Sequence, residues 1–182
     1  MPTLCEEPTM VAEQEFRDLM AGVCAPVTVV TAMEDDRPHG ATVSAFASLS
    51  LRPPMVTIAL DAGSQLLARI ERTGRFGINV LSHAQDELAM GFARRSADRF
   101  TGVDWYADHG LPRLSDSPGW IVCDLARNVS GGDHRLLLGS VVHAQTVIAP
   151  PLVYSHRTFG THSGFAERPR RPLTDQLVAC SR

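Results

Sequence analysis

Apolar and polar residues along the chain follow two different periods, which together predict several strands and a few short helices. From Met10 to Val23, the apolar residues Phe16, Leu19 and Met20 recur at the three- and four-residue spacing of one helical face. Charged and amide side chains occupy the positions between them. The segment is therefore predicted to be an amphipathic helix.

Strands are predicted where β-branched and other apolar residues cluster between turn residues. Ser64 stands at the start of a predicted helix over 64–72, and Ser82 with Gln85 has the sequence pattern of a capping box for a helix over 82–95. Residues 101–118 contain several glycines and prolines and are predicted to form a loop. The predicted strands cover residues 26–32, 42–51, 55–60, 75–81, 120–129, 134–148 and 152–154.

These elements predict a mainly β protein, a barrel or sandwich with peripheral helices, because most of the strands are joined by turns. A chain of 182 residues fits one domain, and no repeat or linker divides it. We expect a flexible N-terminal arm over 1–9, the folded domain over 10–162 and a C-terminal tail over 163–182.

The most informative strand pattern lies between His39 and Val56. With the period of two that a strand imposes, one face carries small hydroxyl side chains, and ten successive residues have no charge. A flat polar ligand could lie close to such a backbone, but a Ser/Thr-rich edge strand beneath a loop would give the same pattern. The first face is formed by Thr42, Ser44, Phe46, Ser48 and Ser50, and the opposite face by Val43, Ala45, Ala47, Leu49 and Leu51.

Composition excludes several classes of protein. The apolar fraction of 44% and the net charge of −3 are typical of a globular protein and favour neither nucleic acid nor an anionic membrane as a partner. No apolar run reaches the roughly 20 residues of a membrane helix, and no secretory leader is recognisable, so a cytoplasmic location is expected. The four cysteines and seven histidines show no metal-ligand spacing, and no metal site is predicted.

Two segments are candidate anion sites. The helix that begins at Ser64 has unpaired amides in its first turn, which favour a phosphate, although ordinary capping explains Ser64 equally well. Arg94, Arg95 and Ser96 follow the next predicted helix, where favourable charge at a helix C-terminus is the alternative explanation. The chain has no glycine-rich Rossmann fingerprint and no P-loop, so a nucleotide would have to be held in another way.

Two further segments could contact a ligand. His134 follows the turn residues Gly131, Gly132 and Asp133, where it either faces a ligand or lies in solvent. Residues 154–160 combine two aromatic side chains with His156 and Arg157, and the aromatic rings alone would more often belong to a core.

Taken in order, these segments resemble the flavin reductase family, the short reductase components of two-component flavin-dependent monooxygenases. The resemblance spans residues 16–160. It rests on an ordered set of short motifs: Pro26 to Thr31; His39-Gly40 with Thr42 to Phe46; Ser48 to Leu51 with Pro53-Pro54; Gly74 to Phe76 with Asn79 to Leu81; Arg99-Phe100 with Gly102-Val103 and Trp105; and Gly132 to His134. The chain departs from the family pattern at Ala25-Pro26, where many members have Thr-Gly, and at Phe159, where many have Tyr.

The resemblance implies a split β-barrel FMN-binding fold, a Greek-key-like antiparallel barrel, and a homodimer with flavin near the subunit interface. It implies FMN or FAD as the flavin and NADH or NADPH as the reductant. Carried over by position, the flavin would lie along Thr42, Val43, Ser44, Ala45, Phe46, Ser48 and Ser50. Its ribityl and phosphate part would contact Asp61, Gly63, Ser64, Gln65 and Leu66, with Arg94, Arg95 and Ser96 nearby. Tyr154, Arg157 and the candidate catalytic residue His134 would lie on the nicotinamide side.

The reaction implied is hydride transfer from the nicotinamide to the flavin, followed by release of reduced flavin to a partner monooxygenase. Such a step requires no strong nucleophile, because the cofactors carry the chemistry and the protein supplies position and exclusion of water. Two alternatives remain at this stage. One is a flavin oxidase similar to the enzymes that oxidise pyridoxine phosphates, and the other is a non-enzymatic flavin- or haem-binding protein.

Overall fold

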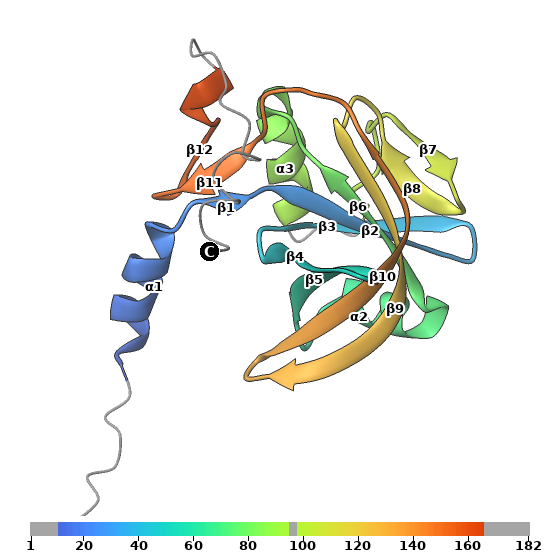
Figure 1. The fold of residues 1–182 in the computed structure, drawn as a ribbon, viewed down its shortest axis with the longest axis horizontal. Helices are drawn as coiled ribbons and strands as arrows, with labels where there is room; N and C mark the ends of the chain where they lie inside the picture. The colour runs from blue at the N-terminus through green and yellow to red at the C-terminus, as the bar shows by residue number, and fades with distance from the viewer. Residues whose placement is uncertain (1–10, 95–97, 166–182) are drawn as a thin grey trace, which may run out of the picture.

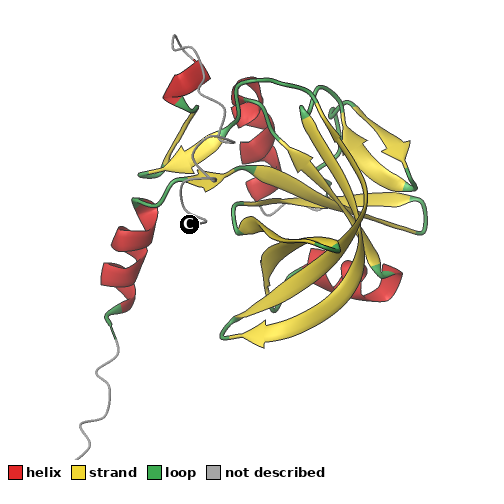
Figure 2. Ribbon diagram, in the orientation of Figure 1, coloured by secondary structure: helices red, strands yellow, loops and turns green. Residues whose placement is uncertain are grey.

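The fold of residues 11–94 and 98–165 is described by a computed structural model and is built mainly of β-strands (Figures 1 and 2). Seven strands form one sheet in which all neighbours are antiparallel. The prediction of a mainly β protein with few helices is confirmed. In spatial order the strands are β3 (Arg37–Val43), β2 (Thr28–Glu34), β6 (Arg75–Val80), β9 (Gly119–Gly131), β10 (His134–Thr146), β5 (Pro54–Asp61) and β4 (Phe46–Leu51).

The two edge strands of this sheet, β3 and β4, are consecutive in the chain. Only Ser44 and Ala45 separate them, so the sheet must curl until its two edges come close at one end. The amide of Ala59 in β5 donates to the carbonyl of Ala45 at 3.0 Å, which holds this corner. No hydrogen-bonded ladder joins β3 to β4 within the described residues, so the curled sheet is not closed into a barrel.

The interior of the curled sheet is apolar and is covered at one end by α2 (Gln65–Thr73). Leu66, Leu67 and Ile70 of this helix pack against Ile58, Phe76, Ile78 and Leu137 of the sheet. The side chain of Ser64 accepts from the amide of Leu67 at 3.4 Å, and Gly74 ends the helix with a φ of 70°. The helix predicted over 64–72 is therefore confirmed, together with the cap predicted at Ser64.

The opposite side of β2 and β3 is covered by α3 (Asp86–Ala93), which follows the short helix η1 (His83–Gln85) (Figure 1). The capping box of Ser82 and Gln85 is present, as predicted. Phe92 of α3 is buried, and its ring meets Phe100 edge-on at 5.0 Å between centroids. A Cβ at Gly40 would come within 2.9 Å of the Phe92 ring, so the backbone of β3 approaches this layer closely.

The buried thiol of Cys123 gives a direct test of how tightly the interior of the curled sheet is packed. Burial raises the pKa of Cys123 to about 12, whereas the thiol of Cys24 is exposed. With iodoacetamide at pH 8, we expect rapid alkylation of Cys24 and none of Cys123, because the thiolate is the reactive form. Peptide mass spectrometry before and after addition of denaturant measures this. Equal labelling of the two thiols in the native protein would show that the sheet opens readily.

Two predictions about the strands are wrong. Residues 42–51 do not form one strand, because the chain turns a corner at Ser44 and Ala45. The predicted loop over 101–118 contains a hairpin of β7 (Trp105–Asp108) and β8 (Leu111–Leu114). Its two-residue turn, His109-Gly110, has positive φ at both positions, and the usual Asn-Gly signal for such a turn is absent. The short strand predicted over 152–154 is confirmed as β11 (Val153–Ser155), which lies in a second sheet with β1 (Ala25–Pro26) and β12 (Thr158–Gly160).

The N-terminal helix forms where it was predicted, as α1 (Glu13–Ala21), but its apolar face is exposed. Phe16 and Leu19 are 55% and 70% exposed, and Figure 1 shows α1 projecting away from the main sheet. The amphipathic helix is therefore confirmed, and the described part of the chain leaves its apolar face uncovered. The arm predicted over 1–9 lies outside the described residues, as does the tail beyond the short helix η2 (Ser163–Phe165). No helix in the described ranges is long and apolar enough to cross a membrane.

Candidate functional site

A cavity of about 1120 Å³, here called the β3-edge cavity, runs along the outer edge of β3. Its floor is the backbone of residues 37–41, which form an edge strand and so leave one row of peptide groups without a neighbouring strand. One wall comes from the loop between β5 and α2 together with Arg69, and the other comes from residues 98–100. The cavity therefore lies between segments that are distant in the sequence.

Five predicted cofactor-binding residues line this cavity from the side of α2. They surround the start of the helix, where the Asp61 carboxylate accepts from the amide of Gly63 at 2.7 Å. The Ser64 hydroxyl caps the helix, while the amides of the next residues have no partner within the helix. Capping and anion attraction thus coexist at this helix start. The five residues are Asp61, Gly63, Ser64, Gln65 and Leu66.

Arg99 lines the opposite wall and was not singled out as a site residue from the sequence. It donates to the carbonyl of Arg94 at 2.8 Å and to the carbonyl of Gly40 at 2.7 Å. Within the described residues it has no carboxylate partner, and burial lowers the pKa of its guanidinium below the usual value. A partly buried cation without a counter-ion favours an anionic ligand.

The second predicted arginine cluster is only partly described. Arg94 is exposed at the end of α3, and its carbonyl accepts from Arg99. Arg95 and Ser96 lie outside the described residues.

The predicted Ser/Thr face begins where the cavity ends, since Ala41 lines the cavity and Thr42 follows it. The Thr42 hydroxyl donates to the carbonyl of Ala89 at 2.6 Å, which ties β3 to α3. Val43 belongs to the core and Phe46 packs against it, while Ser44, Ala45 and Ser48 are exposed. Ser50 accepts from the amide of Arg52 at 3.2 Å.

The expected alternation of the two faces is wrong beyond the corner. Ala47, Leu49 and Leu51 are exposed, because the corner at residues 44–45 and a register shift between Ser48 and Ser50 break the period of two. The hydroxyl side chains of residues 42–50 therefore do not share one continuous face.

His134 begins β10 and lies opposite Asp61 in the antiparallel ladder with β5. The ring Nδ1 lies 2.8 Å from the carboxylate of Asp133, and this hydrogen bond lowers the pKa of Asp133 below its usual value. The carbonyl of Asp133 accepts from the amide of Ala62 at 2.9 Å. The turn between β9 and β10 thus packs against the loop that forms one wall of the cavity, and the His134 ring remains exposed.

Tyr154 and Arg157 lie on the small sheet and not in the wall of this cavity. The Tyr154 ring packs against Phe159 at 5.1 Å between centroids, and Arg157 pairs with Asp18 of α1 at 2.7 Å. Ala25 and Pro26, where the chain departs from the family pattern, pair with β11 in the same sheet. Within one described chain, the predicted site residues Tyr154 and Arg157 therefore do not line the cavity that holds residues 61–66.

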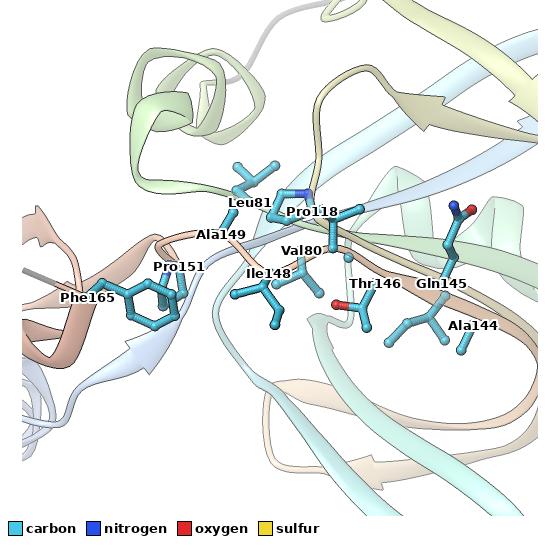
Figure 3. A pocket seen from close by; sticks show the side chains of 13 residues that line it. Val80, Leu81, Pro118, Ala144, Gln145, Thr146, Ile148, Ala149, Pro151 and Phe165 are labelled. Carbon is cyan, nitrogen blue, oxygen red and sulfur yellow. The ribbon is translucent and has the colours of Figure 1, made fainter. Parts of the chain in front are cut away.

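A second cavity, of about 480 Å³, lies at the C-terminal end of β10 and is almost entirely apolar (Figure 3). Phe165 and Pro151 lie at one end of it, and Gln145 and Ala144 lie at the other. Ile148, which contributes to the lining, is 80% exposed. No group of three His, Cys, Asp or Glu side chains within residues 11–94 and 98–165 is arranged to hold a metal ion.

The flavin reductase like domain family matches residues 20–163 of the chain. The reductase component of a 4-nitrophenol 4-monooxygenase/4-nitrocatechol 2-monooxygenase from Rhodococcus opacus is 38% identical over 146 residues, which are 80% of this chain and 79% of the relative. An NADH:riboflavin 5'-phosphate oxidoreductase from Streptomyces pristinaespiralis is 35% identical over 83% of this chain and 89% of its own length. The solved structure of an NADH:FAD oxidoreductase from Streptomyces globisporus has a TM-score of 0.79 at 28% identity, covering 89% of this chain and 99% of that one.

These similarities extend over most of the chain and include the strands, the start of α2 and the segment of Arg99 that form the β3-edge cavity. The family expected from the ordered motifs is confirmed, and with it the enzyme class of a nicotinamide-dependent flavin reductase. This chain belongs to the flavin reductase like domain family.

Proposed function

We propose that this chain transfers a hydride from NADH or NADPH to FMN or FAD held in the β3-edge cavity, and that it supplies the reduced flavin to a partner monooxygenase. The observation that carries the proposal is the pair of anion-attracting groups on opposite walls of one cavity. Arg99 pairs with no carboxylate in the described part of the chain, and the first turn of α2 presents amides that have no partner within the helix. The names of the relatives, a monooxygenase reductase component and two NADH-dependent flavin oxidoreductases, support this activity.

The flavin phosphate is proposed to lie between Arg99 and residues 63–66, with Arg94, Arg95 and Ser96 nearby. The isoalloxazine ring is proposed to lie beyond Ala41, along residues 42–50, where small side chains allow close approach to the backbone. When bound, the flavin supplies the hydride acceptor. The protein then needs only to position the two ring systems and exclude water, which fits a site without a strong nucleophile.

The curled sheet is proposed to be the core of a split β-barrel, with the corner at Ser44 and Ala45 at the split. Two features support this: the edge strands β3 and β4 are consecutive in the chain, and the interior between them is filled by apolar side chains. The folded domain is proposed to span residues 10–162. The use of reduced nicotinamide nucleotides favours a cytoplasmic location.

His134 is proposed to contact the nicotinamide, because it lies beside Asp61 at the cavity wall and its ring is exposed. For His134→Ala, we expect kcat/KM for NADH to fall about fivefold, since one hydrogen bond contributes about 1 kcal/mol. The rate of loss of nicotinamide absorbance measures this. The control is His83→Ala, an exposed histidine outside the cavity, which should leave kcat/KM unchanged. Unchanged kcat and KM in His134→Ala would remove the role of His134.

A homodimer is proposed because several apolar surfaces of the described chain lack a cover. They comprise one face of α1 and the apolar cavity near Ile148. Tyr154 and Arg157 lie away from the cavity of their own chain, and a second copy could supply them to it. Light scattering coupled to size exclusion is expected to give twice the mass of the chain. A monomeric mass at micromolar concentration would contradict the dimer.

One assay separates this function from its alternatives. Purified protein is mixed in air with NADH or NADPH and added FMN or FAD, and the loss of nicotinamide absorbance is followed. A flavin reductase consumes the nicotinamide only when flavin is added. A flavin oxidase similar to pyridoxine phosphate oxidases would purify with tightly held flavin and show no such turnover. A non-enzymatic flavin- or haem-binding protein would bind its cofactor but leave NADH and NADPH intact.

A further inference from the structure

The β3-edge cavity extends well beyond the site proposed for the first flavin phosphate. From Ala41, next to the proposed ring site, its floor continues along β3 to Arg37. Four residues of extended strand span about 13 Å. Arg99 donates to the carbonyl of Gly40, so the phosphate proposed beside Arg99 leaves the part of the floor from His39 to Arg37 for another portion of the ligand.

Two further arginines line this remaining part of the cavity. Arg37 is exposed and makes no ion pair within the described part of the chain. The Arg69 side chain is 21% exposed, donates to the carbonyl of Gln65 at 2.9 Å, and lies 3.4 Å from a Glu34 oxygen. Glu34 already binds Arg72 through two hydrogen bonds. Asp35 and Asp36 of the adjoining turn are exposed and, like Glu34, lie outside the lining of the cavity. The lining at this end therefore presents the two arginines, which favours a second anionic group.

His39 lies between these two arginines on the floor of the cavity. Burial, and then the charge of Arg69, lowers the pKa of its ring below the usual value. Arg37 and Arg72 act in the same direction, and Glu34 opposes them. The imidazole is consequently neutral at neutral pH. A neutral, half-buried ring offers a stacking surface and hydrogen-bonding groups for an uncharged heterocycle.

We propose that Arg37, His39 and Arg69 form the subsite for the adenylate half of FAD, so that this chain prefers FAD to FMN. The inference rests on the proposed function. It follows from the order of chemical groups along β3: small side chains for the ring system, then Arg99 and the α2 amides for the first phosphate, then two arginines and a neutral ring. The same order of groups occurs along FAD, whereas FMN ends at the first phosphate.

The affinities of oxidised FAD and FMN test this, measured by calorimetry on the full chain, on Arg37→Ala and on a matched control. Arg127→Ala is the control because Arg127 is also an exposed strand arginine without a described ion pair, and it lies outside the cavity. We expect the unmodified chain to bind FAD at least about tenfold more tightly than FMN, which corresponds to about 1.4 kcal/mol. Arg37→Ala should weaken FAD about five- to tenfold and FMN less than twofold. The control should change neither affinity, and AMP should displace FAD but not FMN.

Several outcomes would overturn this subsite. Equal affinities for the two flavins would do so, as would an Arg37→Ala variant that weakens both flavins to the same extent. A rise only in the KM for NADPH would show instead that these arginines bind a ribose 2'-phosphate. Failure of the proposed function looks different, because NADH and NADPH would then not be consumed with either flavin, whatever the binding data show.

Discussion

Asn79→Ala is expected to lower the free energy of unfolding by about 3–4 kcal/mol. The Asn79 side chain is fully buried, and its Nδ2 donates to the carbonyls of Val29 at 3.2 Å and Pro112 at 3.4 Å. Its Oδ1 accepts from the amide of Leu114 at 2.8 Å. The substitution leaves the buried amide of Leu114 without its side-chain acceptor and removes a donor from the carbonyls of Val29 and Pro112, of which Pro112 keeps the Thr31 hydroxyl. An unsatisfied buried group costs roughly 1–3 kcal/mol, and the lost side-chain packing adds to this.

The loss should be concentrated at the β7–β8 hairpin. Asn79 lies on β6 and holds β8 at a buried position, together with the Thr31 hydroxyl, a donor to the carbonyl of Pro112 at 2.8 Å. The other hydrogen bonds from the hairpin to the main sheet, from Arg75 to the carbonyl of His109 and from Arg113 to Gln145, are exposed. Urea unfolding measures the total loss, and amide hydrogen exchange measures opening of residues 105–114. Asn128→Ala is the matched control, because Asn128 contacts only surface side chains and should cost less than about 1 kcal/mol. Equal losses in the two variants would contradict this role of Asn79.

Features determined by neighbouring residues were predictable from the sequence. The α2 helix begins after Ser64 and ends before Gly74 because a hydroxyl cap and a residue with positive φ are encoded at its two ends. The capping box of Ser82 and Gln85 is equally local. The strands that became β2, β5, β6, β9 and β10 carry strong β-branched and apolar patterns between clear turn residues, and they were predicted within a few residues.

Features that depend on distant contacts were not predictable. The β7–β8 hairpin contains Pro112 and a His-Gly turn, which look like loop signals, and it is held by Asn79 and Thr31 from other strands. The corner between β3 and β4 carries no turn signal, because Ser44 and Ala45 belong to an uninterrupted strand-like pattern. The exposure of α1 was also missed, since its spacing reports an apolar face but not what covers that face.

The same distinction between local and distant features applies to the candidate site. Residues 61–66 could be proposed from a local helix start. Arg37, Arg69 and Arg99 could not, because they come from three separate segments, and only the curl of the sheet and the packing of α2 bring them to one cavity. The motif Arg99-Phe100 was the single sequence signal for that wall. The structure gives a physical reason for this motif, because Arg99 donates to the carbonyl of Gly40 on the cavity floor.

Arg99→Met is expected to weaken both FMN and FAD about 100-fold. Methionine retains much of the apolar stem but removes the guanidinium proposed to bind the phosphate that both flavins share. Charge-assisted hydrogen bonds contribute roughly 1.5–3 kcal/mol each, so a loss of about 2.7 kcal/mol is expected, which corresponds to about 100-fold in affinity. Calorimetry with each flavin measures the change, and the KM for flavin in the NADH assay should rise in parallel.

The matched control is Arg75→Met, because the Arg75 guanidinium, like that of Arg99, donates to the backbone carbonyl of another segment. It donates to the carbonyl of His109 at 3.1 Å and pairs with Asp124 at 3.0 Å, outside the cavity. Its flavin affinities should be unchanged, whereas a similar loss in both variants would point to a general effect of charge or folding. Arg99→Met should weaken the two flavins equally, but Arg37→Ala should weaken only FAD. The two arginines are thereby assigned to different parts of the ligand, since a shared phosphate and an adenylate half respond differently to their removal.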